Sequence, residues 1–246
     1  MSAELVTASS RSGEQGRYRY YDLIMAAFVT VLLCSNLIGP GKSCRIDVAG
    51  HSLVFGAGNI FFPISYLFDD VLTEVYGFAR SRRVIWAGFG ALVFATLMST
   101  VIINLPVDAQ EPFSVKLQPA IELVFGNGYR IVVGSLFAFW AGDFVNSFVL
   151  AKMKIWTEGR WLWTRTIGST LAGEGVDSLV FYPIAFAGLW TNHTLFAVIA
   201  FNWFFKCALE VIATPFTYQV IAFLKKHEGV DHYDRGTDFN PFSLDA

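Results

Sequence analysis

Six apolar segments, each close to the roughly 20 residues that a transmembrane helix needs, dominate this chain. They cover residues 20–38, 57–76, 84–105, 131–151, 166–190 and 195–224. Charged residues make up 15% of the chain, against about 25% in a typical soluble domain. Because lipid offers no partner to an exposed backbone, apolar segments of this length predict helices. We therefore expect an all-α integral membrane protein with six transmembrane helices.

The rest of the chain is polar at both ends. Residues 1–18 lack an apolar core and a cleavage pattern, which predicts a disordered tail and not a signal peptide. Residues 19–226 form the predicted six-helix domain, and residues 227–246 form a polar C-terminal tail. Three cysteines without a CxxC spacing imply no disulfide framework.

The distribution of Lys and Arg predicts the orientation. With a cytoplasmic N-terminus, the inner segments hold three basic residues before the first span, three after the second, four after the fourth and three after the sixth. The outer segments together hold four. Basic residues concentrate in cytoplasmic loops, so we place both termini in the cytoplasm.

Two long connections lie on the predicted outer side. The stretch "CRIDVAGHSLVF" alternates loosely and predicts a small β-hairpin. The stretch "SVKLQPAIELVFG" is apolar on one side, which is typical of a segment that lies in the membrane interface or dips back into the bilayer. Both are candidate gates, and packing over the helix ends explains them equally well.

Polar and charged residues recur at similar depth in four of the apolar segments. They are Asp69, Asp70 and Glu74 in the second, Asp143 and Asn146 in the fourth, Glu174 and Asp177 in the fifth, and Lys206 and Glu210 in the sixth. A charge at the centre of a bilayer costs about 2.5–3.5 kcal/mol on insertion scales. The convergence of four helices therefore predicts a polar site that extends from the membrane midplane inward.

Helical spacing predicts which of these residues share a face. Tyr66, Asp70 and Glu74 lie on one face of the second segment, and Asp69 points about 100° away from Asp70. The spacing also places Asp143 beside Asn146 and forms a stripe of Thr170, Glu174, Asp177 and Phe181.

Three of the charges also have a purely structural interpretation. Lys206 and Glu210 are four residues apart, so the two can neutralise one another within one helix. Glu74 lies near the basic stretch "ARSRR", where Arg80 or Arg83 would pair with it at the membrane interface.

Three other acids, Asp143, Glu174 and Asp177, have no basic neighbour within one helical turn. They must face a wet cavity, pair with Lys206 or Arg165 across a helix interface, or hold a proton. We interpret them as functional.

Small residues repeat every fourth position in two segments. The repeats are Ala87, Ala91, Ala95 and Ser99 in the third segment, and Gly134, Ala138 and Gly142 in the fourth. Such stripes let helix backbones approach closely. Packing within the chain and a homodimer face are both compatible with them.

The sequence excludes several classes of function. It contains no GxGD, G-x-S-x-G, H-E-x-x-H, P-loop or dinucleotide motif, and its four histidines lie in predicted loops or tails. Nothing indicates nucleic acid or a bound cofactor, and no repeated pore signature indicates a channel. Carboxylates and amides beside Tyr66, Trp140, Phe181 and Trp203 would suit a flat heterocycle that carries N–H donors. We therefore predict a transporter for a small polar molecule.

Four stretches resemble the queuosine precursor transporter family, a group within the vitamin uptake transporters. They are "FFPISYLFDDVLTEVYG", "AGDFVNSFVLAKMK", "RTIGSTLAGEGVDSLVFYPIAFAG" and "DRGTDFNPF", in this order along the chain. The resemblance implies a multi-pass importer in the bacterial plasma (inner) membrane. Its substrates would be 7-cyano-7-deazaguanine or 7-aminomethyl-7-deazaguanine for tRNA modification.

The resemblance also implies a substrate site. Matching by motif gives Asp70, Glu74, Asp143, Asn146, Arg165, Ser169, Glu174 and Asp177, to which the residue pattern adds Tyr66, Phe181, Trp203 and Lys206. We expect Glu174 or Asp177 to accept the N1–H and the exocyclic amine of the base, with Asn146 at its carbonyl and Phe181 or Trp203 stacked on it. Asp70 or Asp143 would take up a coupling proton.

One alternative is a substrate-binding membrane subunit that depends on an ATP-driven module. Such subunits often carry A-x-x-x-A on their first span, and "LIMAAFVTVLLCSNL" has none. This difference favours a self-sufficient transporter.

Overall fold

The computed structural model describes residues 18–37, 43–48, 51–56, 61–126 and 128–243. Within these ranges the chain forms seven helices and one two-stranded sheet. The helices are α1 (Tyr21–Leu37), α2 (Phe62–Tyr76), α3 (Phe78–Asn104), α4 (Pro112–Phe125), α5 (Tyr129–Trp156), α6 (Leu162–Phe186) and α7 (Asn192–Glu228). Residues 1–17 of the predicted tail and residues 57–60 of the second predicted segment lie outside the described residues.

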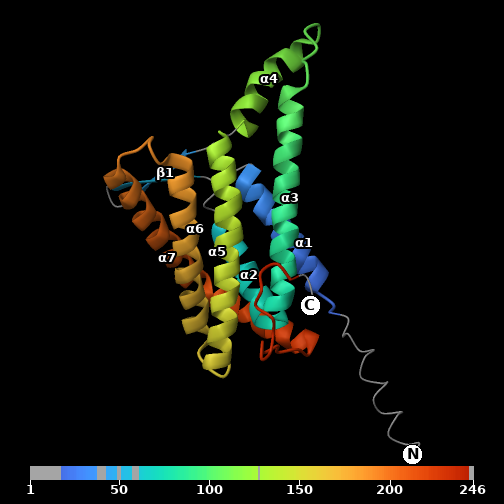
Figure 1. The fold of residues 1–246 in the computed structure, drawn as a ribbon, viewed down its shortest axis with the longest axis vertical. Helices are drawn as coiled ribbons and strands as arrows, with labels where there is room; N and C mark the ends of the chain where they lie inside the picture. Colours follow the sequence, from blue (N-terminus) through green and yellow to red (C-terminus); the bar gives the residue numbers. More distant parts are fainter. Residues whose placement is uncertain (1–17, 38–42, 49–50, 57–60, 127, 244–246) are drawn as a thin grey trace, which may run out of the picture.

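Six of the helices coincide with the six predicted apolar segments. They are all except α4, and they lie side by side as a bundle (Figure 1). Within the described ranges, α3, α5 and α7 are long and apolar enough to cross a membrane. α1 is apolar but has 17 residues, and α2 has 15. The structure therefore confirms a helical membrane protein with several apolar helices.

The two connections that the sequence predicts on the outer side form the elements that their patterns suggest. Strands β1 (Ser43–Val48) and β2 (His51–Gly56) pair antiparallel, so the predicted hairpin is confirmed. The second connection contains α4, which lies at the end of α3 remote from the C-terminal segment (Figure 1). Glu111 caps α4, and its carboxylate accepts hydrogen bonds from the backbone N–H of Phe113 and Ser114.

α5 and α6 form the most extensive helix pairing of the described fold. Their backbones approach closely where Gly142 faces Gly173, because a Cβ atom at Gly173 would lie 2.9 Å from the carbonyl oxygen of Gly142. A Cβ atom at Gly142 would in turn lie 3.0 Å from the Cβ atom of Asp177. The small-residue stripe of the fourth segment therefore packs within the chain, against α6.

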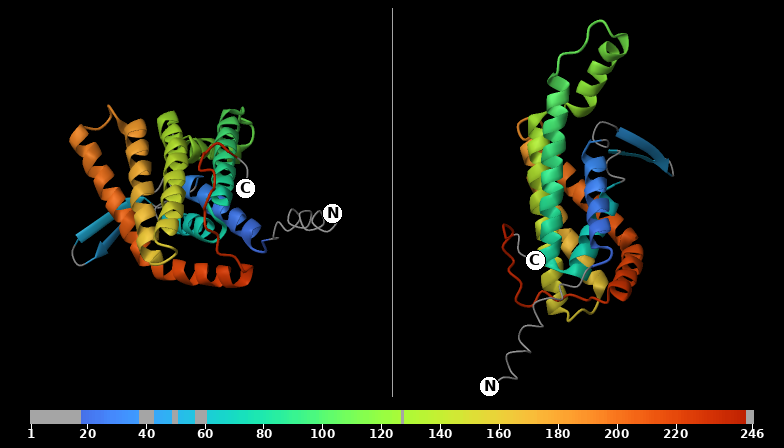
Figure 2. Two further views of the ribbon diagram at one scale, coloured as in Figure 1. Left: turned by 60° about the horizontal axis from the view of Figure 1, so that its bottom comes forward. Right: turned by 90° about the vertical axis from the view of Figure 1, so that its right-hand side faces the viewer.

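α7 is the longest helix, with 37 residues, and it changes direction along its course (Figure 2). Pro215 lies inside it, and an internal proline removes a backbone hydrogen bond and favours a kink. Gly229 ends the helix in the left-handed conformation, with φ of 65°. The chain then continues as an irregular segment, 229–243, which packs under α2, α3 and α5.

The main apolar core lies where α1, α2, α3 and α5 meet. Phe28, Val71, Val75, Tyr76 and Ile85 are almost fully buried within it. This core holds α2 and α3 in a fixed arrangement around their one-residue connection at Gly77, which has φ of 85°. The C-terminal end of α2 and the N-terminal end of α3 are thereby packed together at one end of the bundle.

Candidate functional site

A cavity of about 540 Å³ lies among the six bundle helices, toward the end that carries α4. Its walls are largely apolar and aromatic and include Phe139, Phe181, Phe186 and Trp190. The charged residues that the structure places in its lining are Asp143, Asp177 and Lys206. This combination of apolar walls with a few polar groups is typical of a small-molecule site.

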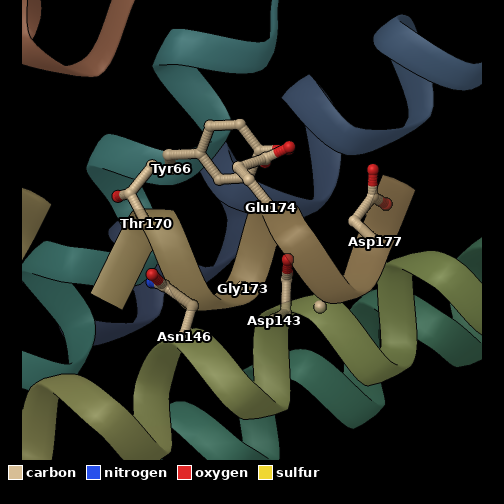
Figure 3. Close-up of a pocket in the computed structure, with 8 residues that line it drawn as sticks. Tyr66, Asp143, Asn146, Thr170, Gly173, Glu174 and Asp177 are labelled. Atoms are coloured by element: carbon tan, nitrogen blue, oxygen red, sulfur yellow. The ribbon is translucent and has the colours of Figure 1, made fainter. Parts of the chain in front are cut away.

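A much smaller polar pocket, of about 10 Å³, adjoins the cavity (Figure 3). Its lining consists of Tyr66, Gly142, Asp143, Asn146, Thr170, Gly173, Glu174 and Asp177. The larger cavity shares Tyr66, Asp143 and Asp177 with it. In Figure 3 the side chains of Tyr66, Asn146 and Glu174 approach one space from α2, α5 and α6. Three of the four helices that were predicted to supply polar residues to one site therefore meet at this pocket.

Lys206 supplies the contribution of the fourth helix. Its Nζ atom lies 2.6 Å from Asp177 Oδ2 and 2.8 Å from Glu174 Oε2. It also donates to the hydroxyl of Tyr66 at 3.4 Å. Lys206 therefore pairs across the α6–α7 interface, and the predicted pair of Lys206 with Glu210 within one helix is not formed. One cation compensates two carboxylates here.

Several oxygens around the small pocket lack a hydrogen-bond partner within the described residues. They are Oδ1 of Asn146, Oγ1 of Thr170 and Oε1 of Glu174, and all three are buried. Buried polar groups in proteins are nearly always hydrogen-bonded. Their common location leaves unused hydrogen-bonding capacity in this pocket for a group from outside the chain.

Asp69 and Asp70 lie beside this pocket and share one amide. The Nδ2 atom of Asn146 donates to Asp69 Oδ2 at 2.7 Å and to Asp70 Oδ1 at 3.0 Å. Asp69 also accepts from the hydroxyls of Ser147 and Ser81, at 2.8 and 3.0 Å. Asp69, which helical spacing leaves without a role, therefore fastens α2 to α5 and α3.

Glu74 is the hub of a separate ionic network. Arg165 donates to both of its carboxylate oxygens, at 2.9 and 2.8 Å. Lys225 and Lys154 lie 2.6 and 3.4 Å from Glu74 Oε1. Glu74 is therefore ion-paired, as the structural interpretation predicts, but the prediction that its partner is Arg80 or Arg83 of the "ARSRR" stretch is wrong. Folding brings cations of α5, α6 and α7 closer to Glu74 than the arginines of α3.

Five of the predicted site residues lie outside both cavities in the described part of the chain. They are Asp70, Glu74, Arg165, Ser169 and Trp203. Ser169 is buried and donates to the carbonyl of Thr166 at 2.9 Å. Trp203 is 40% exposed, and its indole N–H donates to the carbonyl of Leu171 at 3.0 Å. The side chain of Trp203 is thus directed away from the cavity.

The other seven predicted residues line one cavity or both. These are Tyr66, Asp143, Asn146, Glu174, Asp177, Phe181 and Lys206. The structure adds Tyr182 and Asn202, which also line the larger cavity. Asn202 lies one helical turn before Lys206, so an i, i+4 search from the buried lysine would have found it. No group of three His, Cys, Asp or Glu residues is placed to hold a metal ion within the described ranges.

Comparison with known proteins identifies relatives of this chain. The family described as "Putative vitamin uptake transporter" matches residues 56–220. A Bacillus subtilis protein named "Probable queuosine precursor transporter" is 29% identical over 163 residues, which cover 65% of this chain and 69% of the relative. An Escherichia coli protein named "Queuosine precursor transporter" is 24% identical over 206 residues, which cover 83% and 81%. No solved structure matches.

Proposed function

This chain belongs to the vitamin uptake transporter family, and from that premise we propose that it imports queuosine precursors of the 7-deazaguanine class. As a member of a transporter family it is a multi-pass membrane protein and not an enzyme. The names of the two relatives support this substrate class. The cyano and aminomethyl precursors are the substrates we propose, and the bacterial inner membrane is the proposed location.

The proposed topology has six spans and two cytoplasmic termini. The spans are α1, α2, α3, α5, α6 and α7, while β1, β2 and α4 lie on the outer side. The excess of Lys and Arg at the opposite end supports this orientation. We also propose that residues 19–226 form the transmembrane domain, with residues 1–18 and 227–246 as cytoplasmic tails. The cavity of about 540 Å³ then lies toward the outside.

The observation that carries the proposal is the group Lys206, Glu174 and Asp177, of which Lys206 and Asp177 line this cavity and Glu174 lines the small pocket beside it. The cavity falls within the range of about 300–1,000 Å³ that small-molecule sites occupy. The aromatic residues of its wall would contact the faces of a flat bicyclic base, and its polar residues would bind the edge. A purely structural ion pair would need no adjoining cavity.

A 7-deazaguanine presents two adjacent N–H donors and a carbonyl on one edge. Glu174 Oε1 has no partner in the described chain and is buried, so it would accept from the N1–H and the exocyclic amine. The Nδ2 atom of Asn146 already donates to Asp69 and Asp70, so its unpartnered Oδ1 would accept a further N–H of the base and would not contact the carbonyl. Phe181 lines the cavity and would stack on the ring. The exposed position of Trp203 favours Phe181 for this role.

Coupling to a proton is the second part of the proposal. Asp143 is 8% exposed and lines both the cavity and the small pocket. Its carboxylate is therefore reachable from the cavity, whereas Asp70 is fully buried and lies behind Asn146. We assign proton uptake to Asp143 on this ground. Protonation would cancel one negative charge beside the substrate as the binding site changes sides.

The test measures uptake of labelled precursor by cells that cannot synthesise it. The double variant Glu174→Gln with Asp177→Asn should lose at least about tenfold in uptake, because a hydrogen bond to a charged group contributes about 1.5–3 kcal/mol. The matched control is Glu122→Gln, which removes a carboxylate from the exposed face of α4 and should leave uptake unchanged. Uptake is normalised to the amount of protein in the membrane. Unchanged uptake by the double variant would contradict the site assignment.

A further inference from the structure

The segment that follows α7, residues 229–243, is held by buried side chains of the helices. Arg82 of α3 is 1% exposed and donates to the carbonyls of Asp238 and Asn240, at 2.8 and 2.7 Å. Trp86, one turn further along α3, donates to the carbonyl of Pro241 at 2.7 Å. A buried guanidinium that donates to this segment shows that the segment packs against α3 and is not free in solvent.

A second set of contacts fixes the start of the same segment. The carboxylate of Asp234 accepts from the backbone N–H of Phe78, at 3.1 Å to each oxygen. The ring of His232 packs on Gly77, where a Cβ atom would lie 2.2 Å from its Cδ2 atom. Gly77 is the one-residue connection between α2 and α3. The segment therefore covers the point where these helices meet.

Asp231 joins this segment to the ionic network of Glu74. Lys154 Nζ lies 2.6 Å from Asp231 Oδ1, and Lys225 Nζ lies 2.8 Å from the same oxygen. Both lysines also contact Glu74. The network thus contains three cations, including Arg165, and two carboxylates. Without Asp231, three cations would share one carboxylate in a largely buried space, and their repulsion would favour separation of the helices.

The network lies in a layer of its own, inward from the cavity. The cavity residues are Tyr66, Asp143, Asp177 and Lys206, and the network residues of the same four helices are Glu74, Lys154, Arg165 and Lys225. The two layers are 8 or more residues apart on every helix, which is about 12 Å or more along a helix axis. All four helices place the network toward the end where residues 229–243 lie (Figure 1).

The acids of the segment keep their charge at neutral pH, so the contacts of Asp231 with the lysines persist until the helices move apart. Burial would raise the pKa of Asp231, but hydrogen bonds from Lys154 and Lys225 hold it below the usual 3.8. Burial would also raise the pKa of Asp234, but hydrogen bonds from the His232 ring and from the backbone N–H of Phe78 lower it below its ordinary value. A depressed pKa adds stability above the ordinary pKa, and this stability is lost as the pH falls through the folded value. Both carboxylates therefore stay ionised at neutral pH.

We propose that residues 229–243 are a clasp that closes the cytoplasmic end of the transport path, and that Asp231 fastens it to the Glu74 network. This inference rests on the proposed transport function and assigns the inner gate of the transporter to the clasp. In the structure the cavity lies outward of the network, which corresponds to an outward-facing state with the gate shut. Inward opening requires Lys154 and Lys225 to release Asp231. Glu74 and Arg165 thereby act as gate residues and not as substrate ligands.

The test measures how readily a thiol between the two layers reacts from the cytoplasmic side. Cys34, Cys44 and Cys207 are first replaced by serine, and Ser169→Cys is introduced as the reporter. Ser169 is fully buried on α6, one turn from Arg165 toward Glu174. A membrane-impermeant thiol reagent is applied to inside-out vesicles that contain the full-length chain. Slow labelling is expected while Asp231 is present.

Asp231→Asn should speed this labelling about tenfold, which corresponds to a shift of about 1.4 kcal/mol toward the open state. Asp231→Glu, which keeps the charge, should restore slow labelling. The matched control is Glu158→Gln, which removes an exposed carboxylate from the α5–α6 turn on the same side and should label slowly.

Equally slow labelling of the parent and Asp231→Asn would overturn the clasp, as would equal acceleration by Glu158→Gln. The measurement needs no substrate, so it separates the clasp from the proposed function. Accelerated labelling in a chain that transports no deazaguanine would support the clasp and contradict only the substrate.

Discussion

Replacing Lys206 by methionine should abolish precursor uptake and strongly destabilise the protein. The ammonium group lies within 2.8 Å of two carboxylates and is 8% exposed. Its removal leaves Glu174 and Asp177 together without their cation, and breaking a buried ion pair in this way costs about 3–5 kcal/mol. The measurements are uptake by cells and the thermal stability of the purified protein in detergent.

A triple variant separates the structural effect from the functional one. Lys206→Met combined with Glu174→Gln and Asp177→Asn has no unpaired charge in this group, so much of the lost thermal stability should return. Uptake should remain abolished, because the acceptors for the base are changed as well. Full uptake by the triple variant would show that the group serves folding alone and would refute the site.

The change Glu74→Gln should have an effect of similar size, through a different group. Glu74 is fully buried and contacts Arg165, Lys154 and Lys225. Glutamine keeps the shape but leaves three cations with the half-exposed Asp231 as their anion. We expect a loss of about 3–5 kcal/mol in stability, measured as a fall in the thermal transition. Uptake should fall with it, since the proposed inner gate would no longer close.

A compensating change checks the electrostatic cause. Adding Lys225→Met to Glu74→Gln removes one of the three cations, so the thermal transition should recover in part. A double variant as unstable as Glu74→Gln alone would show that packing, and not charge balance, accounts for the loss.

The helices themselves were predictable because apolar length is a local property. Each predicted segment overlaps one of the bundle helices, and the ends agree to within a few residues at most termini. α7 extends to Glu228, beyond the predicted limit of residue 224, because the amphipathic stretch around Lys225 continues the helix into the ionic network. The loose alternation of the first outer connection correctly indicated the hairpin.

The candidate site was only partly predictable. Helical spacing placed Glu174 and Asp177 on one face, and the structure shows that Lys206 binds both. Spacing fixes the angle between residues of one helix but not the rotation of that helix against its neighbours. The partnership of Glu74 with Arg165, 91 residues later, depends on that rotation. The exposed position of Trp203, away from the cavity, depends on helix rotation in the same way.

Transport by the purified chain alone tests whether this protein is itself a proton-coupled importer. The chain is reconstituted into liposomes with an inward proton gradient, and labelled 7-cyano-7-deazaguanine or 7-aminomethyl-7-deazaguanine is supplied outside. We predict accumulation of at least one of the two precursors, with no added ATP-driven module, and its loss when the gradient is abolished. Binding without accumulation would contradict the account and would identify the chain as a substrate-binding subunit.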